Sequence, residues 1–171
     1  AGGPAGGDRR WAFAVTPGKH RGQLLLIGGR HVLDDCYNAN PASMAAALRT
    51  LVGLRGTHAA VAILGDMLEL GPTEASLHAE LGEVAAECGL TRLVTLGTRA
   101  RHLAAAAQRR GVPTEIVESA DDAARAAAAA TQPGDFILLK GSRGMALEGV
   151  IDRLRALLQD PAAPAAVQQV H

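Results

Sequence analysis

The run Ala59-Ala60-Val61-Ala62-Ile63-Leu64, followed by a helical pattern at residues 74–88, decides the fold class. Six apolar residues without a polar break are typical of a strand that is buried on both faces. In the helical segment, Leu77, Leu81 and Val84 recur on one face at helical spacing. A buried strand that leads into such a helix indicates a parallel sheet covered by helices.

The same alternation continues in both directions from this unit. Further strands are predicted at 92–96, 115–117 and 135–139, and further helices at 41–54, 99–110, 119–131 and 146–158. Upstream, two short apolar runs flank Gly28-Gly29-Arg30 and predict an antiparallel hairpin. The predicted class is therefore α/β: a three-layer, Rossmann-like, mostly parallel sheet with helices on both faces and one antiparallel N-terminal strand.

The length of 171 residues fits one domain with irregular ends. A start rich in Gly, Ala and Pro predicts a flexible end or linker at residues 1–20. The regular pattern runs from 21 to 158, and a stretch rich in Pro, Ala and Gln predicts a disordered tail at 159–171.

Composition excludes several classes of function. Lys plus Arg and Asp plus Glu both number 17, so no overall field attracts nucleic acid or an anionic membrane. No apolar run approaches the roughly 20 residues that a membrane helix needs. Cys36 and Cys88 have neither the spacing of metal ligands nor the density of a disulfide scaffold. We therefore expect a cytoplasmic protein with no nucleic-acid partner, no membrane span and no metal site.

The first candidate loop is residues 34–41, which follow the second strand of the hairpin. Asp35 at a strand end can accept both hydroxyls of a ribose, and the amides of Asn38 and Asn40 can serve a base edge or phosphate oxygens. Tyr37 adds a phenol, and the helix that starts next offers free N–H groups to an anion. The structural alternative is that Asp and Asn only form the turn and cap the helix.

The second candidate loop is residues 65–72, after the central strand. Gly65 allows close approach of a ligand or of another backbone, and Asp66 lies at the strand mouth. His78, one turn into the next helix, is a candidate for the same mouth. The structural alternatives are a plain Gly-Asp turn and a histidine that is structural or exposed to solvent.

The third candidate loop is residues 140–145, after the last strand. Lys140, Ser142 and Arg143 among glycines form a loop suited to an anion, and Arg143 suits bidentate binding of a carboxylate or phosphate. The chain contains neither a Gly-x-x-x-x-Gly-Lys-Ser/Thr phosphate loop nor Gly-x-Gly-x-x-Gly. If ATP is used, the grip on its triphosphate must come from elsewhere.

These loops, in this order, resemble the C-terminal domain of the Mur ligase family in its D-alanyl-D-alanine-adding branch. The resemblance covers about residues 21–158. The matching segments are Asp34-Asp35-Cys36-Tyr37-Asn38-Ala39-Asn40-Pro41-Ala42-Ser43-Met44, Leu64-Gly65-Asp66-Met67-Leu68-Glu69-Leu70-Gly71, His78-x-Glu80-x-Gly82 and Leu139-Lys140-Gly141-Ser142-Arg143-Gly144-Met145.

The resemblance implies an ATP-dependent ligase that adds D-Ala-D-Ala to UDP-MurNAc-tripeptide, the last cytoplasmic step of peptidoglycan precursor synthesis. Family members have an N-terminal domain for the UDP-sugar and a central ATPase domain, over which the C-terminal domain closes. ATP phosphorylates the terminal carboxylate of the tripeptide, and the amine of the dipeptide attacks the acyl phosphate. ATP and Mg²⁺ are then both held mainly by the central domain.

The resemblance also implies roles for single residues, with no catalytic residue and no metal ligand in this domain. Those on the nucleotide side are Asp35, for the ribose, with Tyr37, Asn38 and Asn40. Those on the substrate side are Lys140, Ser142 and Arg143, for the dipeptide, with Asp66 and His78 near that pocket.

One residue departs from the family, and two alternatives stay open. Cys36 stands where the family usually has Ser and is a weaker hydrogen-bond donor. Without a phosphate loop, the chain alone is expected neither to hydrolyse ATP nor to form a peptide bond. The first alternative is a stand-alone nucleotide-binding module without catalysis. The second is a phosphohydrolase with Asp34 or Asp35 as nucleophile and Lys140 as charge stabiliser, although neither Asp has an acid two residues later.

Overall fold

A computed structural model describes residues 20–159 and 169–170 of the chain. The predicted flexible end lies outside the described residues except for His20. Most of the predicted tail lies outside them too, and residues 169–170 form a short strand that the sequence did not predict.

The described residues form a seven-stranded sheet and five α-helices in the alternating order that the sequence predicts. The strands are β1 Gln23–Ile27, β2 Arg30–Asp35, β3 Ala60–Gly65, β4 Arg92–Leu96, β5 Thr114–Val117, β6 Phe136–Lys140 and β7 Gln169–Val170. The helices are α1 Pro41–Arg55, α2 Glu74–Glu87, α3 Ala100–Arg109, α4 Ala120–Ala129 and α5 Glu148–Leu158.

The strand order is β5-β4-β3-β6-β2-β1-β7, with β6 and β3 in the middle. The five strands from β5 to β2 are parallel, whereas β1 pairs antiparallel with β2 through the Gly28-Gly29 turn. β7 pairs antiparallel with the other side of β1. The mostly parallel sheet with an antiparallel N-terminal strand is therefore confirmed.

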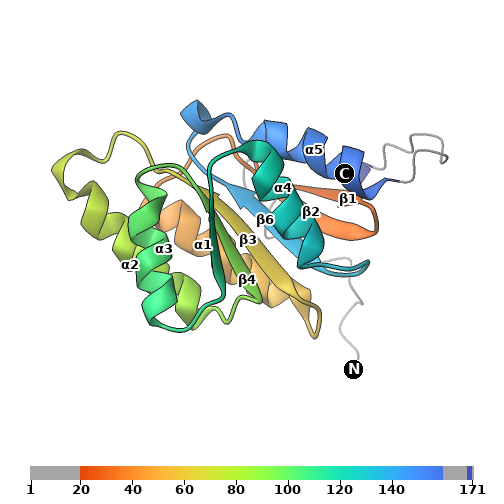
Figure 1. Ribbon diagram of the computed structural model, residues 1–171, viewed down its shortest axis with the longest axis horizontal. Coiled ribbons are helices and arrows are strands. Elements are labelled where there is room, and N and C mark those ends of the chain that lie inside the picture. Colours follow the sequence, from red (N-terminus) through yellow and green to blue (C-terminus); the bar gives the residue numbers. More distant parts are fainter. Residues whose placement is uncertain (1–19, 160–168, 171) are drawn as a thin grey trace, which may run out of the picture.

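Helices cover both faces of the sheet, which gives the three predicted layers (Figure 1). One apolar core lies between the sheet and the pair α4 and α5, with alanines from α4 and larger aliphatic side chains from α5. The other core lies between the sheet and α1, α2 and α3. Figure 1 shows α2 and α3 together at one end of the sheet and α4 and α5 together towards the other. None of the helices in the described residues is long and apolar enough to span a membrane.

The start of the last helix differs from the prediction. The helical pattern predicts a start at Ala146, but α5 begins at Glu148 after a single 3-10 turn at Arg143–Met145. Ala146 has a left-handed backbone with φ of 50° and ends that turn. Because of this turn, α5 starts two residues later than predicted, and Leu147 and Val150 are buried in the core.

Candidate functional site

The three predicted polar loops converge at one edge of the sheet, because β2, β6 and β3 are parallel neighbours. In the register of the sheet, Asp35 of β2 lies opposite Lys140 of β6, and Lys140 lies opposite Leu64 of β3. The carboxyl end of such a sheet is where α/β folds bind ligands. The candidate residues of the three loops are therefore gathered at this edge.

Lys140 forms an ion pair with Asp35 in the centre of this edge. Its Nζ donates to Asp35 Oδ2 at 2.8 Å and to the main-chain oxygen of Asn38 at 3.0 Å. The Lys140 side chain is only 3% exposed, whereas that of Asp35 is 25% exposed. The sequence assigned these residues to different halves of the site. In the structure the two residues form one ion pair. The Lys140 ammonium group also binds the Asn38 carbonyl and so fixes the loop from Asp35 to Asn38.

The nucleotide-side loop contains one carboxylate oxygen that is still available. Among the described residues, Asp35 Oδ1 makes no hydrogen bond. Asn38 is exposed, and its Oδ1 accepts a hydrogen bond from the next main-chain N–H, that of Ala39, at 2.8 Å. Asn40 forms a capping box with Ser43 at the start of α1, with both bonds near 3 Å. Asn40 therefore caps α1, as the structural alternative predicted, and its contact with a nucleotide stays a prediction.

Tyr37 lies beside two arginines that come from different segments. The guanidinium carbon of Arg21 lies 3.6 Å from the centre of the Tyr37 ring, and that of Arg143 lies at 5.2 Å. The pKa of the Tyr37 phenol is lowered, first by its hydrogen bond to Arg21 and the charge of Arg21, and then by the charge of Arg143. Two cations and an aromatic face form a patch that suits an anion or a planar group. Arg21 was not predicted as a site residue from the sequence, because it precedes the first strand and lies outside the three polar loops.

Asp66 is buried and organises the start of α3. Its Oδ1 accepts a hydrogen bond from the main-chain N–H of Ala100 at 2.7 Å, which satisfies a free donor of that helix. Arg99 Nη1 lies 3.6 Å from Asp66 Oδ2, and Arg99 Nε donates to Glu74 Oε2 at 2.7 Å. Gly97 packs directly on the carboxylate, since a Cβ there would lie 2.3 Å from Oδ1. The geometry gives Asp66 a structural position, and its contact with a ligand stays a prediction.

His78 is fully buried, and both ring nitrogens have protein partners. The main-chain N–H of Met67 donates to Nε2 at 3.0 Å, and Nδ1 lies 2.6 Å from the carbonyl oxygen of Glu74. This pairing requires a neutral ring with its proton on Nδ1. His78 therefore fixes the loop after β3 in the way that the structural alternative describes. Direct contact of His78 with a substrate remains an untested prediction.

The loop after β6 is fastened to the loop after β3. The Ser142 hydroxyl accepts a hydrogen bond from Leu68 N at 2.8 Å, and Ser142 N donates to Asp66 O at 3.0 Å. A Cβ on Gly141 would lie 3.1 Å from the Cα of Gly65, so each glycine admits the backbone of the other loop. Of the three residues predicted for this loop, only Arg143 is exposed.

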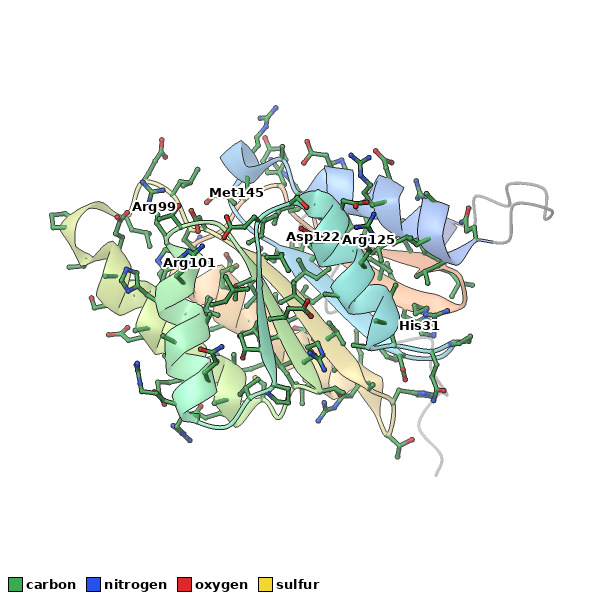
Figure 2. The ribbon with its side chains drawn as sticks, in the orientation of Figure 1. His31, Arg99, Arg101, Asp122, Arg125 and Met145 are labelled. Atoms are coloured by element: carbon green, nitrogen blue, oxygen red, sulfur yellow. The ribbon has the colours of Figure 1, made fainter. Side chains whose placement is uncertain are left out.

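A hollow of about 320 Å³ lies at the same edge of the sheet. It is lined by residues 96–98, 118–120 and 145–147, which come from the loops after β4, β5 and β6. Figure 2 shows Arg99 and Met145 on this edge of the molecule and His31 at the opposite one. The loops after β4 and β5 were not predicted as part of the site, since they contain no dense polar motif.

Asp34 points away from this edge into a different environment. It is 1% exposed, with Oδ2 at 2.5 Å from His20 Nδ1 and Oδ1 accepting from Cys36 Sγ at 2.9 Å. Burial, and then the hydrogen bond to Asp34, raise the pKa of the Cys36 thiol. Asp34 is therefore enclosed and cannot be reached by a substrate, whereas Asp35 is partly exposed and is paired with Lys140 through Oδ2.

Comparison with known proteins gives a consistent result. The family profile described as "Mur ligase, glutamate ligase domain" matches residues 20–143. The chain is 34% identical over 128 residues to UDP-N-acetylmuramoyl-tripeptide–D-alanyl-D-alanine ligase of Bacillus subtilis, covering 74% of this chain and 28% of that protein. It is 36% identical over 159 residues to the ligase of the same name from Mycobacterium tuberculosis, covering 81% and 31%.

The fold is also similar to a solved structure. The crystal structure of MurF ligase from Thermotoga maritima in complex with ADP matches with a TM-score of 0.68 and 25% sequence identity. The match covers 81% of this chain and 31% of that one. The chain thus spans less than a third of the length of each of these relatives.

Proposed function

Because this chain belongs to the Mur ligase family, we propose that it is the C-terminal domain of an ATP-dependent ligase that adds D-Ala-D-Ala to UDP-MurNAc-tripeptide in peptidoglycan synthesis. The observation that carries the proposal is the convergence of Asp35, Tyr37 and Arg143 at the carboxyl edge of the sheet. The ligase names of the Bacillus and Mycobacterium relatives support the choice of substrate. The family match favours this function over a stand-alone nucleotide-binding module.

On the nucleotide side, Asp35 is proposed to accept the ribose hydroxyls of ATP. The Asp35 side chain is partly exposed, and its Oδ1 has no partner among the described residues, while Lys140 binds Oδ2. The ring of Tyr37, in the loop that follows Asp35, is covered by the guanidinium group of Arg21. This pair can bind the base or a phosphate of the nucleotide. These groups fit a nucleotide, and the ADP bound to the Thermotoga maritima relative supports that class of ligand.

On the substrate side, Arg143 is proposed to bind the carboxylate of D-Ala-D-Ala. It is the exposed cation of the loop after β6, and its fork of donors matches a carboxylate. Lys140 and Ser142 are buried, so we propose that they position Arg143 rather than contact the dipeptide. Asp66 and His78 are proposed to have no direct contact with the dipeptide. They would hold in place the loop after β3, to which Ser142 is hydrogen-bonded.

The remaining parts of the site are proposed to lie in a central ATPase domain, which would hold the triphosphate and Mg²⁺. ATP would supply the phosphoryl group that activates the carboxylate of the tripeptide. The residues of this domain would place the dipeptide amine next to that carboxylate and exclude water. Their contribution to the reaction rate would come from orienting the reactants rather than from groups that take part in bond breaking. A cytoplasmic location belongs to the same proposal, because the reaction consumes ATP and a UDP-linked precursor.

The ribose role can be tested in a chimeric ligase, in which residues 20–158 replace the matching region of the Bacillus subtilis relative. Asp35→Asn removes the charge but keeps the shape. We expect the KM for ATP to rise about tenfold, which corresponds to roughly 1.4 kcal/mol. Asp122→Asn, on the exposed first turn of α4, is the matched control and should leave the KM unchanged.

Because Asp35 also pairs with Lys140, the unfolding transition of each variant must be measured beside the kinetics. An Asp35→Asn chimera that is folded and has the wild-type KM for ATP would refute the ribose role.

A further inference from the structure

A second cluster of polar side chains lies on the side of β2 that the proposed site does not use. It joins His20, from the turn before β1, with Asp34 near the end of β2 and Cys36 just after it. One ligand atom from each residue, the His nitrogen, the carboxylate oxygen and the Cys sulfur, lies within 4.8 Å of the other two. Asp34 and Cys36 are buried, and His20 is partly exposed.

The composition of the cluster is that of a transition-metal site. Imidazole nitrogen, thiolate sulfur and carboxylate oxygen are the three ligand types that Zn²⁺ accepts in proteins, at roughly 2.0 to 2.3 Å. Ligand atoms around a tetrahedral ion of that size lie a few ångströms apart, so the cluster needs only small side-chain movements. The spacing of the two cysteines alone gave no sign of a metal site. Asp34 and Cys36, however, are two residues apart on an extended chain and therefore share one face.

The surroundings of the cluster offer an open pocket and a further carboxylate. A pocket of about 300 Å³ opens beside it and is lined by His20, Asp34 and Glu148, among others. Glu148 is exposed at the first position of α5, and its charge acts on the thiol of Cys36. A carboxylate on the open side of a three-ligand set can complete a tetrahedron.

We propose that His20 Nδ1, Asp34 and Cys36 Sγ bind one divalent transition metal of the Zn²⁺ class, with Glu148 as the fourth ligand. One proton leaves for solvent when the ion binds, the thiol proton that Cys36 donates to Asp34. His20 coordinates through Nδ1, which lies beside Asp34 Oδ2, and carries its ring proton on Nε2, so the imidazole stays neutral. The ion then faces a thiolate, a neutral imidazole and carboxylates, which are the forms that coordinate metal.

Metal at this position would also stiffen the edge that carries Tyr37. The carbonyl oxygen of His20 accepts a hydrogen bond from Tyr37 N at 3.0 Å, and the next residue, Arg21, covers the Tyr37 ring. A bound ion would therefore tie the Arg21–Tyr37 pair to β2. This consequence for nucleotide binding rests on the proposed function, but the metal site itself does not.

The test is a titration of the reduced, chelator-treated 171-residue chain with Co²⁺, followed by displacement with Zn²⁺. We expect one equivalent of Co²⁺ to produce both the visible bands of a tetrahedral ion and a thiolate-to-cobalt charge-transfer band. Cys36→Ser should remove the charge-transfer band. His20→Ala should weaken binding by at least the roughly 10- to 100-fold that loss of a supporting partner costs at metal sites.

Cys88→Ser is the matched control, because Cys88 is a half-buried free thiol at the end of α2, outside the cluster. It should change neither the spectrum nor the affinity. The proposal is overturned if no saturable band appears, or if the charge-transfer band persists in Cys36→Ser and disappears in Cys88→Ser. Because absorbance reads the site without any activity, this result is independent of whether the chimeric ligase works.

Discussion

Replacing Lys140 with Met is expected to lower ligation by the chimera about 100-fold, because small displacements of positioning groups cost that much. Lys140 is buried and reaches Asp35 Oδ2 and the Asn38 carbonyl, so its ammonium group holds the nucleotide-side loop in place. Met fills a similar volume without the charge, and the Asp35 carboxylate then loses its partner. The free energy of unfolding of the chain should fall by about 3 kcal/mol, the lower end for breaking a buried ion pair, because Asp35 is partly exposed.

The matched control is Arg49→Met, which removes an exposed cation from α1. It should change the free energy of unfolding, measured by urea titration, by less than about 0.5 kcal/mol. Equal effects of the two substitutions on unfolding and ligation would contradict the central position given to the Lys140–Asp35 pair.

Replacing Gly141 with Ala is the second change with a large expected effect. A Cβ at this position would lie 2.5 Å from Leu147 Cδ1 and 3.1 Å from the Cα of Gly65. Leu147 is buried and the Gly65 contact is main chain, so the two loops must separate. Overpacking of this kind should lower the free energy of unfolding by about 2 kcal/mol. Ligation should fall further than stability alone explains, because Ser142 and Arg143 follow directly in the chain.

Gly53→Ala is the matched control: it adds the same methyl group but is expected to stabilise the fold. Gly53 is exposed within α1, and a Cβ there would meet nothing within 4 Å. Ala should therefore raise the free energy of unfolding by roughly 0.5 to 1 kcal/mol, the usual gain from replacing a helical glycine. If thermal or urea unfolding showed that Gly141→Ala is as mild as Gly53→Ala, the close approach of the two loops would be wrong.

The fold could be predicted from the sequence because local patterns are strong in this chain. Uninterrupted apolar runs such as residues 59–64 mark strands buried on both faces, and alanine-rich segments between them mark helices. The order of strands in the sheet could not be predicted, since periodicity does not report which strands are neighbours. The left-handed turn at Ala146 was missed because alanine is a poor marker for that conformation.

The candidate site was predicted in its loops but not in its contacts. The sequence identified the three polar loops, yet it could not show that Lys140 is buried against Asp35 while Arg143 is exposed. It also could not show that Arg21 covers Tyr37, because that contact depends on how the chain enters β1. Pairings across strands and loops depend on three-dimensional neighbours, which adjacent residues in the sequence do not reveal.

The most direct test of the central claim is ligation by the wild-type chimera, measured as ATP-dependent joining of D-Ala-D-Ala to UDP-MurNAc-tripeptide with release of ADP. The Bacillus subtilis ligase with its own C-terminal region is the positive control, and the 171-residue chain alone is the negative one. We predict that the chimera forms the peptide bond and that the chain alone does not. A chimera that unfolds cooperatively and binds ATP, but joins no dipeptide under conditions where the positive control does, would contradict the account.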